Sequence, residues 1–292
     1  MSIKVLIIGG TGFIGKNIIR RCIKNRWKVF ATYYRKKPNN KKIKSFFLDL
    51  ANPKIPKKYN INFDHIFFSA GEIDHEDRNH EKVLNEHFYS ILKITKKIKA
   101  KNFYYFSTAD EYKSSKKNLV ETSSKISLKT YYSLAKHLAG QYLLTLHKKR
   151  VFNVIIFRIF IVYGPGQNTN RLIPSIITSL ANNKKFMILN SNLKKDFLFI
   201  DDFIDAVFMA IKIKKLLGRV VNVGSGKSIS LKYLGNIIQR LVRKGKVNFK
   251  NSKSHYSSSQ YSSIDLIKNN SNWKPQTSIK LGLTKTIESF NK

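Results

Sequence analysis

The sequence predicts an α/β fold with a doubly wound parallel sheet, followed by a smaller C-terminal α/β lobe. One observation is that segments typical of buried strands alternate with helical segments through the first 160 residues. Another is that this rhythm changes after Gly164-Pro165. We therefore expect a first domain at residues 1–162 and a smaller lobe mainly at residues 163–292, some segments of which return to the first domain.

The expected elements are placed by their apolar patterns and turn residues. Strands are expected at residues 4–8, 28–33, 45–48, 65–69, 103–107 and 153–158. Helices are expected between them at residues 12–24, 79–99 and 130–149. In the lobe we expect helices at 173–182 and 202–212, a strand at 220–223 and a long surface loop at 250–263, which is rich in Ser, Lys and Tyr.

Composition limits the class of protein. The 292 residues are 42% hydrophobic, which is ample for a core, and the single cysteine excludes a disulfide framework and a thiolate metal site, so no metal is expected. The apolar run at residues 3–8 is too short for a secretory signal. No window approaches the roughly 18 apolar residues that span a bilayer. We expect a soluble cytoplasmic protein that does not enter a membrane.

The formal net charge of +38 is extreme and by itself suggests a nucleic-acid partner. However, the basic residues are spread along the whole chain in short runs, so we do not expect nucleic acid to be the main ligand. Between Glu121 and Asp196 there is no Asp or Glu but about a dozen Lys and Arg residues. This stretch is suited to an anionic ligand.

A glycine-rich loop follows the first expected strand and opens the first expected helix. In this context the loop predicts a Rossmann-type dinucleotide site, in which the helix N-terminus offers N–H groups to a pyrophosphate. An ordinary glycine turn between strand and helix would also give this pattern. The cofactor-binding residues of the loop are Gly9, Thr11, Gly12, Phe13, Ile14 and Gly15, with Gly10 between them.

The end of the second strand indicates which nicotinamide cofactor fits. An NAD site has an acidic residue there, whereas this chain has none and offers Arg35 and Lys36 to a 2′-phosphate. NADP is therefore expected in preference to NAD, although in so basic a chain Arg35 is also explained as an incidental surface cation. Asp49 and Leu50, after the third strand, are candidates to meet the adenine, or simply end that strand.

Tyr132 and Lys136 are four residues apart and fall on one face of a helix. An ammonium beside a phenol favours the phenolate, so Tyr132 could exchange a proton with a sugar hydroxyl or ketone while a cofactor exchanges hydride. Thr108, at the end of the fifth strand, could donate a hydrogen bond to the reacting oxygen. Each feature alone also arises by chance, as a surface pair or a strand cap.

The order of motifs resembles that of extended short-chain dehydrogenases/reductases, the NAD-dependent epimerase/dehydratase family that acts on nucleotide sugars. The resemblance covers nearly the whole chain. It rests on the Gly9–Gly15 loop, Asp49-Leu50, Ser69-Ala70-Gly71, Asn85, Ser107-Thr108, Tyr132 with Lys136, Arg158 to Gln167, Asp196 to Asp202, Val221 to Gly224, and Trp273-Lys274-Pro275.

This resemblance implies a Rossmann core with a C-terminal substrate-binding lobe that closes over a nucleotide diphosphate sugar. It implies that Thr108, Tyr132 and Lys136 are catalytic. It also implies a homodimer through helices 79–99 and 130–149. Ser69, Ala70 and Gly71 join the cofactor-binding candidates, together with Tyr132 and Lys136, and the substrate-binding candidates are Asp110, Arg171 and Lys195.

The chain departs from the family pattern at several positions. Ile161 replaces an Asn, Lys195 stands where an Arg precedes Asp-Phe, and no Arg follows Arg243, so the usual pyrophosphate clamp is in doubt. Where relatives read Val-Tyr-Gly after the Thr, this chain has Ala109 to Lys113.

The residues leave the reaction open among several types. We expect an epimerase or 4-keto reductase that transfers hydride at a sugar carbon. A 4,6-dehydratase also fits, because Asp110 and Glu111 offer an acid and a base, although both equally fit a solvated turn. Two further classes of protein agree with the sequence: a non-catalytic nucleotide- or RNA-binding relative, and a reductase of a carbonyl substrate that carries no nucleotide.

Overall fold

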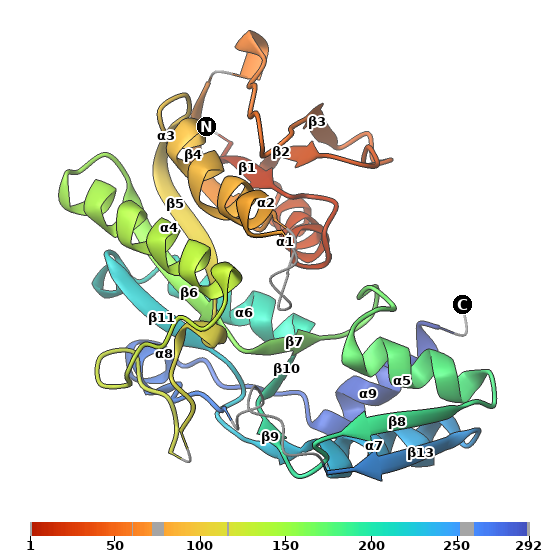
Figure 1. The fold of residues 1–292 in the computed structure, drawn as a ribbon. Helices are drawn as coiled ribbons and strands as arrows, with labels where there is room; N and C mark the ends of the chain where they lie inside the picture. Colours follow the sequence, from red (N-terminus) through yellow and green to blue (C-terminus); the bar gives the residue numbers. More distant parts are fainter. Residues whose placement is uncertain (1, 60, 72–78, 116, 252–259, 291–292) are drawn as a thin grey trace. The chain divides into compact units, whose positions relative to one another are not determined.

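The computed structural model describes residues 2–59, 61–71, 79–115, 117–251 and 260–290, which form two compact units (Figure 1). The first unit comprises Met1–Lys113, Lys125–Arg158 and Ala210–Val221, and the second comprises Ser114–Ser124, Ile159–Met209 and Asn222–Lys292. Residues 114–124 thus pack with the second unit although they precede residue 162.

A seven-stranded sheet forms the centre of the first unit, in the order β11-β6-β5-β4-β1-β2-β3. β1 pairs in parallel with β2 and β4, β2 with β3, and β4 with β5. Because the chain starts at the middle of the sheet and builds outward in both directions, the sheet is doubly wound, as predicted. Its strands are β1 (Lys4–Ile8), β2 (Lys28–Tyr33), β3 (Ile43–Phe47), β4 (Asn62–Phe68), β5 (Lys99–Thr108), β6 (Asn153–Ile159) and β11 (Arg219–Val223).

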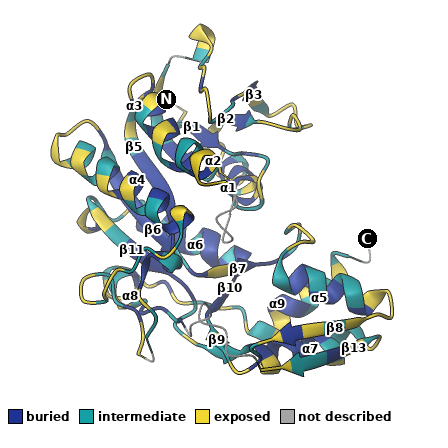
Figure 2. Ribbon diagram, viewed as in Figure 1, coloured by how far each residue is buried: buried dark blue, intermediate teal, exposed yellow. Residues whose placement is uncertain are grey.

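Continuous apolar runs make these strands central. Val5, Leu6, Ile7 and Ile8 are all at most 1% exposed, and Figure 2 shows the strand interiors as buried. Leu6 and Ile8 share one core cluster with residues of α3 and α4, and alternation turns Val5 and Ile7 to the opposite face. A sheet covered on both faces has its ligand-binding groups at its strand ends and loops.

The helices of the first unit are α1 (Phe13–Lys24), α2 (His80–Leu84), α3 (Ser90–Thr95) and α4 (Tyr131–Lys148). A π-helical turn at Asn85–Tyr89 joins α2 to α3, and 3-10 turns lie at Lys57–Tyr59 and Ala109–Glu111. α4 starts where Thr130 and Ser133 form a capping box, each side chain bonding the backbone N–H of the other.

Several expected bounds were wrong in ways that have a common cause. The helix expected to reach residue 99 ends at Thr95, because β5 already begins at Lys99, which pairs with Asn62 of β4. β3 likewise begins two residues earlier than expected. Backbone ladders continue through polar residues, which an apolar pattern cannot reveal.

The second unit is made of short strand pairs and helices. β7 (Ile161–Tyr163) pairs with β10 (Phe197–Phe199) and β8 (Lys185–Leu189) with β13 (Lys246–Lys250), both in parallel, whereas β9 (Lys194–Lys195) and β12 (Ile229–Ser230) are antiparallel. The helices are α5 (Leu172–Ala181), α6 (Ile200–Ala210), α7 (Leu231–Val242), α8 (Asp265–Asn270) and α9 (Ile279–Glu288). A 3-10 turn at Lys214–Leu216 follows α6 in the segment that belongs to the first unit. α6 thus begins and ends two residues before the expected 202–212.

Two aspartates tie this second unit together. Asp196 accepts hydrogen bonds from the backbone N–H groups of Ser225, Gly226 and Ser262, and is 1% exposed. Asp202 accepts from the backbone N–H groups of Gln276 and Thr277. These carboxylates satisfy buried backbone donors, so their part in the structure is to hold loops.

The loop expected at residues 250–263 was wrong at its C-terminal end. Residues 252–259 lie outside the described residues. Gln260, Ser262 and Ser263 are at most 8% exposed, since Asp196 and the backbone of Leu119 draw this polar segment inward. A polar composition indicates a surface loop only where no buried partner satisfies the polar groups.

No helix among the described residues is long and apolar enough to cross a membrane.

Candidate active site and cofactor cradle

The glycine loop of the first unit lies between β1 and α1 in the way that a phosphate site requires. Gly9 has φ +86°, and a Cβ there would lie 2.7 Å from the backbone nitrogen of Ala70. A Cβ on Gly15 would collide with the carbonyl oxygen of Gly9. Gly12 is the N-cap of α1, whose first turn carries no acidic residue. The backbone is therefore shaped so that its N–H groups can approach an anion.

The segment after β4 packs beside this loop. Ser69 donates a hydrogen bond to the carbonyl oxygen of Ile8 at 3.1 Å, and Ala70 is the neighbour that excludes a side chain from Gly9. Gly71 has φ +106°, and a Cβ there would meet the ring of His87. Residues 69–71 thus lie at the loop, as a cofactor-binding role requires.

Asp49 and Leu50 follow the end of β3. Asp49 accepts a hydrogen bond from the backbone N–H of Ala51 at 3.0 Å, which fixes a turn. Leu50 packs against the main core cluster of the first unit. These contacts hold the turn. Asp49 and Leu50 lie just after β3, and their contact with the adenine remains a prediction.

A cavity of about 700 Å³ lies beside the glycine loop, between α1 and the segment after β2. Gly10 and Thr11 line one part of it and Ile19 and Ile43 give it apolar walls. None of the described residues that line it is acidic. Its lining is therefore positively charged, which suits an anion, and partly apolar. Its basic lining residues are Lys16, Arg20, Arg35, Lys36 and Lys37.

Tyr132 and Lys136 lie on the buried side of α4, each 5% exposed. The ammonium of Lys136 donates a hydrogen bond of 2.9 Å to the carbonyl oxygen of Phe106 on β5. It lies 5.8 Å from the ring centroid of Tyr132 and 4.9 Å from that of Tyr105. The helical spacing thus brings the ammonium beneath the phenol ring. The ring of His87 packs edge-on against the ring of Tyr132, with 5.2 Å between the ring centroids.

Burial changes the ionisation of these groups. It lowers the pKa of Lys136 to about 7, although the negative charge of Glu111 acts in the opposite direction. It also raises the pKa of Tyr105 well above its ordinary value. Lys136 is therefore a lysine whose charge changes near neutral pH, which is uncommon outside functional sites.

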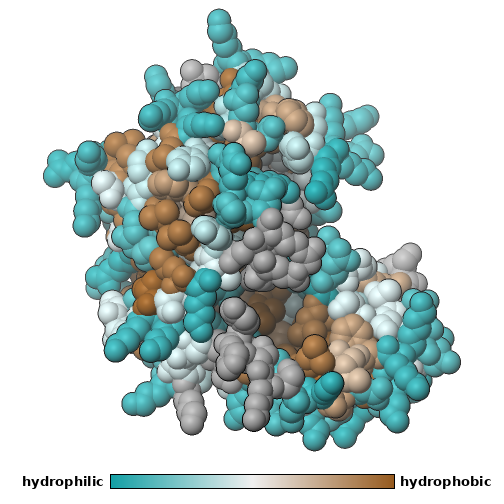
Figure 3. Space-filling model, in the orientation of Figure 1, coloured by the Kyte–Doolittle hydropathy of each residue, from teal (hydrophilic) through white to brown (hydrophobic). Residues whose placement is uncertain are grey.

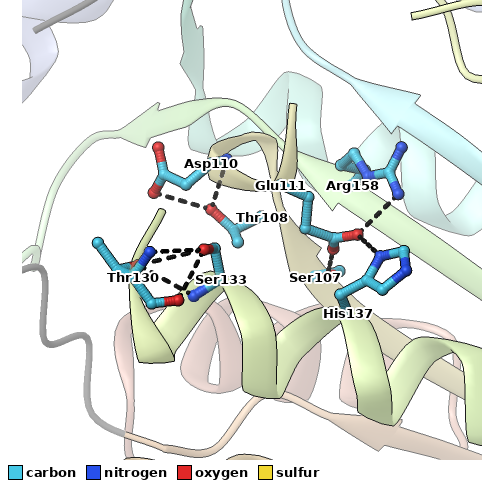
Figure 4. A network of polar contacts seen from close by, with 8 residues as sticks. All are labelled: Ser107, Thr108, Asp110, Glu111, Thr130, Ser133, His137 and Arg158. Atoms are coloured by element: carbon cyan, nitrogen blue, oxygen red, sulfur yellow. Dashed lines mark hydrogen bonds and ion pairs between the residues drawn. The ribbon is translucent and has the colours of Figure 1, made fainter. Parts of the chain in front are cut away.

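Thr108 ends β5 and caps the 3-10 turn that follows. Its hydroxyl donates to a carboxylate oxygen of Asp110 at 3.1 Å and accepts from the backbone N–H of Asp110 at 3.2 Å (Figure 4). The structure thus places the two predicted site residues Thr108 and Asp110 side by side. Thr108 is 8% exposed.

The sequence did not predict the ion network next to Thr108. Glu111 is 2% exposed, and its carboxylate contacts Arg158 on β6 and His137 on α4, each at 2.7 Å, and accepts from the hydroxyl of Ser107 (Figure 4). Burial by itself raises the pKa of Glu111, but the hydrogen bond from His137 and the charge of Arg158 outweigh it and hold that pKa below its usual value. The expectation of a solvated turn at Glu111 was wrong.

Two of the candidate substrate residues belong to the second unit. Arg171 is the N-cap residue of α5, and Lys195 on β9 donates a hydrogen bond from its ammonium to the side-chain oxygen of Gln260 at 3.2 Å. Asp110, Thr108, Tyr132, Lys136 and the cofactor-binding candidates all lie in the first unit. The first unit therefore contains the proposed reacting groups and the cofactor cradle.

The fold and the glycine loop define a dinucleotide-binding α/β protein. Residues 5–224 match the model of the NAD dependent epimerase/dehydratase family, and the chain belongs to that family. The chain is 26% identical over 199 residues to dTDP-D-glucose 4,6-dehydratase of Mus musculus, a match that covers 65% of this chain and 56% of that protein. It is 25% identical over 200 residues to the uncharacterized UDP-glucose epimerase YtcB of Bacillus subtilis (strain 168), covering 68% of this chain and 63% of that protein.

These two matches span less than two thirds of each curated relative. Among solved structures, UDP-glucuronic acid 4-epimerase from Bacillus cereus, in complex with UDP-glucuronic acid and NAD, has the same fold. Its TM-score is 0.88, its sequence identity is 21%, and the match covers 99% of both chains. The predicted Rossmann-type fold is confirmed.

Proposed function

We propose that the chain is an NAD(P)-dependent nucleotide-sugar epimerase or 4-keto reductase in which Tyr132 is the acid/base. The proposal depends above all on the buried Lys136 ammonium, which lies beneath the ring of Tyr132 and is bonded to Phe106, two residues before Thr108 at the end of β5. A buried lysine beside a phenol stabilises the phenolate, which a structural or binding protein does not need.

The cofactor, when bound, exchanges hydride with the sugar carbon. Tyr132 takes the proton of the hydroxyl on that carbon, or returns it to the ketone oxygen. Thr108 donates a hydrogen bond to the same oxygen. To do so, its hydroxyl gives up the hydrogen bond that it donates to Asp110 in the structure. Lys136 holds the negative charge on Tyr132 by its own positive charge, and the carbonyl of Phe106 keeps the ammonium in place.

The residues of the glycine loop would hold the cofactor. A Cβ at Gly9 or Gly15 would strike the chain itself, so these two glycines allow the tight turn and the close packing of α1. Gly12, at the N-cap of α1, is where a pyrophosphate would approach the backbone. The basic cavity with Arg35, Lys36 and Lys37 supports NADP, because a 2′-phosphate adds negative charge that NAD lacks. The Bacillus cereus relative carries NAD, so the preference for NADP requires a comparison of both cofactors.

The substrate would be a nucleotide diphosphate sugar. The names of the curated relatives, a dTDP-glucose dehydratase and a UDP-glucose epimerase, support this class. Arg171 and Lys195 of the second unit and Asp110 of the first are the proposed contacts. Lys195 is a point charge and lacks the bidentate fork of an arginine, so the pyrophosphate contacts are expected to be fewer than in relatives with a late Arg.

Dehydration at C4–C6 is the second candidate function. The carboxylate of Asp110 beside Thr108 favours it, since loss of water after oxidation at C4 needs an acid and a base at the sugar. Glu111 contributes less to this second function, because its carboxylate is already bonded by three neighbours and is 2% exposed.

A single experiment separates the reactions. The protein is incubated with a panel of UDP-, dTDP-, GDP- and CDP-sugars and their 4-keto forms, with the oxidised or the reduced form of either cofactor, and the masses of the products are measured. Epimerisation leaves the mass unchanged, reduction adds two hydrogens and dehydration removes a water. Absence of any product, and of exchange of deuterium from labelled cofactor, would refute the proposed function.

The variant Asp110→Asn refines the result. In a dehydratase this change should suppress the loss of water while hydride exchange continues. In an epimerase or reductase no elimination step depends on the carboxylate, so the change should weaken substrate binding and raise KM more than it lowers kcat.

A further inference from the structure

Glu111 is a buried carboxylate to which the proposed reaction assigns no role. A carboxylate that is 2% exposed costs free energy unless it is paired, and this one is bonded from three elements. Arg158 comes from β6, His137 from α4 and Ser107 from the end of β5. Figure 4 shows these side chains converging on the two oxygens of Glu111.

The partners of Glu111 adjoin the reacting groups in the chain. Ser107 lies between Phe106, whose carbonyl accepts from Lys136, and Thr108. His137 is the residue after Lys136 on α4. The Glu111 carboxylate bonds Ser107 and His137 together and therefore ties the end of β5 to α4 beside Lys136.

Lys136 itself is buried, and the loss of contact with water opposes its charge. The groups that face it are the carbonyl of Phe106 and the ring of Tyr105 on β5, and the ring of Tyr132 on its own helix. Glu111, in the turn after β5, is the carboxylate whose charge acts on Lys136, and that carboxylate is itself bonded by Arg158 and His137. Burial lowers the pKa of Lys136 to about 7, and the charge of Glu111 keeps it from falling further.

We propose that Glu111, held by Arg158 and His137, is a positioning residue that ties the end of β5 to α4 and so fixes the Lys136 ammonium beneath Tyr132. The arrangement makes Glu111 a remote counter-ion for the charge on which Tyr132 depends. This inference rests on the proposed roles of Tyr132 and Lys136 and adds the residue that maintains them. Glu111 does not touch the substrate or the cofactor in this scheme.

The test compares Glu111→Gln with the wild-type chain by two independent measurements. In protein labelled with ¹³C at the lysine ε-carbon, the signal lost in Lys136→Met identifies Lys136, which should titrate near neutral pH, well below the ordinary range of a lysine. In Glu111→Gln this midpoint should move to lower pH by about one unit. In the enzyme assay, turnover at pH 8 should then fall about tenfold, and its decline with rising pH should begin earlier.

Three controls separate charge from stability. Glu111→Asp keeps the negative charge, so the titration midpoint of Lys136 should lie close to that of the wild-type chain. The double variant Glu111→Gln/Arg158→Gln removes both ions, so it avoids an unpaired buried arginine and should fold where the single variant does not, with the midpoint still lowered. Ile94→Ala, in the core of α3, destabilises the same unit by a cavity and should leave the midpoint unchanged.

The outcomes are distinguishable. An unchanged Lys136 midpoint in both Gln variants overturns the inference, even if nucleotide sugars are turned over. A lowered midpoint in a protein without activity on any sugar supports the inference about Lys136 and refutes the proposed function. An equal shift in Ile94→Ala would show that the midpoint reports loosened packing, and would also overturn it.

Discussion

Lys136 donates its hydrogen bond to the carbonyl of Phe106, on the strand that ends two residues later at Thr108. The lysine of the proposed reacting pair is thus anchored to the same strand as the threonine. Because the anchor is a backbone carbonyl of the central sheet, movement of surface side chains does not displace the ammonium. Changes at Tyr132 and Lys136 should therefore report on their own chemistry rather than on a shifted site.

Replacing Tyr132 by Phe should abolish turnover and leave binding of NADPH nearly intact. The ring still packs in its buried position beside Val83 and Ala135, but the group that exchanges the proton is gone. Turnover should fall by about 10³-fold or more. The matched control is Tyr131→Phe, which removes the hydroxyl of the neighbouring tyrosine, 42% exposed, and should change little. Retention of turnover in Tyr132→Phe would exclude this residue from the mechanism.

Lys136 should make the free energy of unfolding depend on pH. Its folded pKa of about 7 lies below the unfolded value, so between about pH 7 and pH 10.4 the unfolded chain binds more protons than the folded chain. Stability from this group therefore rises with pH through that window. Relative to Lys136→Met, the wild-type chain should gain about 3 kcal/mol between roughly pH 6.5 and pH 9.5. Urea unfolding of both proteins at these two pH values measures the difference, and a constant difference would contradict the prediction.

Arg35→Ala should weaken binding of NADPH far more than binding of NADH. Arg35 lines the basic cavity beside the glycine loop, where a charge-assisted contact to a 2′-phosphate is lost only with the phosphorylated cofactor. We expect about tenfold weaker binding of NADPH, or roughly 1.4 kcal/mol. Titration calorimetry with both cofactors checks this. The control is Lys41→Ala, which removes an exposed cation outside the cavity lining. Equal losses of affinity for both cofactors in Arg35→Ala would show that Arg35 does not contact the 2′-phosphate.

Alanine at two helix glycines should have opposite effects. Gly15→Ala forces a Cβ against the carbonyl oxygen of Gly9, so it should destabilise the fold and remove cofactor binding. Gly140→Ala, inside α4, meets only a side-chain methyl group of Ile156 at 3.7 Å and should stabilise the helix by about 0.5–1 kcal/mol. Thermal unfolding with and without NADPH compares the two variants, and similar melting temperatures would contradict the proposed shape of the loop.

The homodimer that the family resemblance implies, through helices 79–99 and 130–149, can be tested at Leu138. Leu138 of α4 and Tyr89 between α2 and α3 are large hydrophobic residues that are 36% and 45% exposed. Figure 3 shows apolar side chains over this part of the first unit among hydrophilic ones. Leu138→Lys places a charge in the proposed interface and should yield monomers in sedimentation experiments. Leu281→Lys, at an exposed position of α9 in the second unit, should not change the oligomeric state.

Local sequence patterns were sufficient for much of the first unit. β1 and β2 have the bounds that were expected, because their apolar runs are bounded by turn residues. α1 and α4 start within one residue of expectation, at Gly12 and Thr130 caps that the sequence displays. The glycine loop and the spacing of Tyr132 and Lys136 are likewise local, since a helix places residues four apart on one face.

The doubly wound fold, the phosphate loop and the choice of Tyr132 and Lys136 thus follow from the order of residues alone. The burial of Lys136, with its pKa near neutrality, and the ion pairing of Glu111 in the core arise only in the folded chain. The partners of Glu111 lie 47 residues away at Arg158 and 26 away at His137, on different elements of the sheet and its covering helix. Likewise the basic cavity forms only when α1 and the segment after β2 meet. Ionisation depends on burial and on charges brought together in space, and neither is contained in a local pattern of residues.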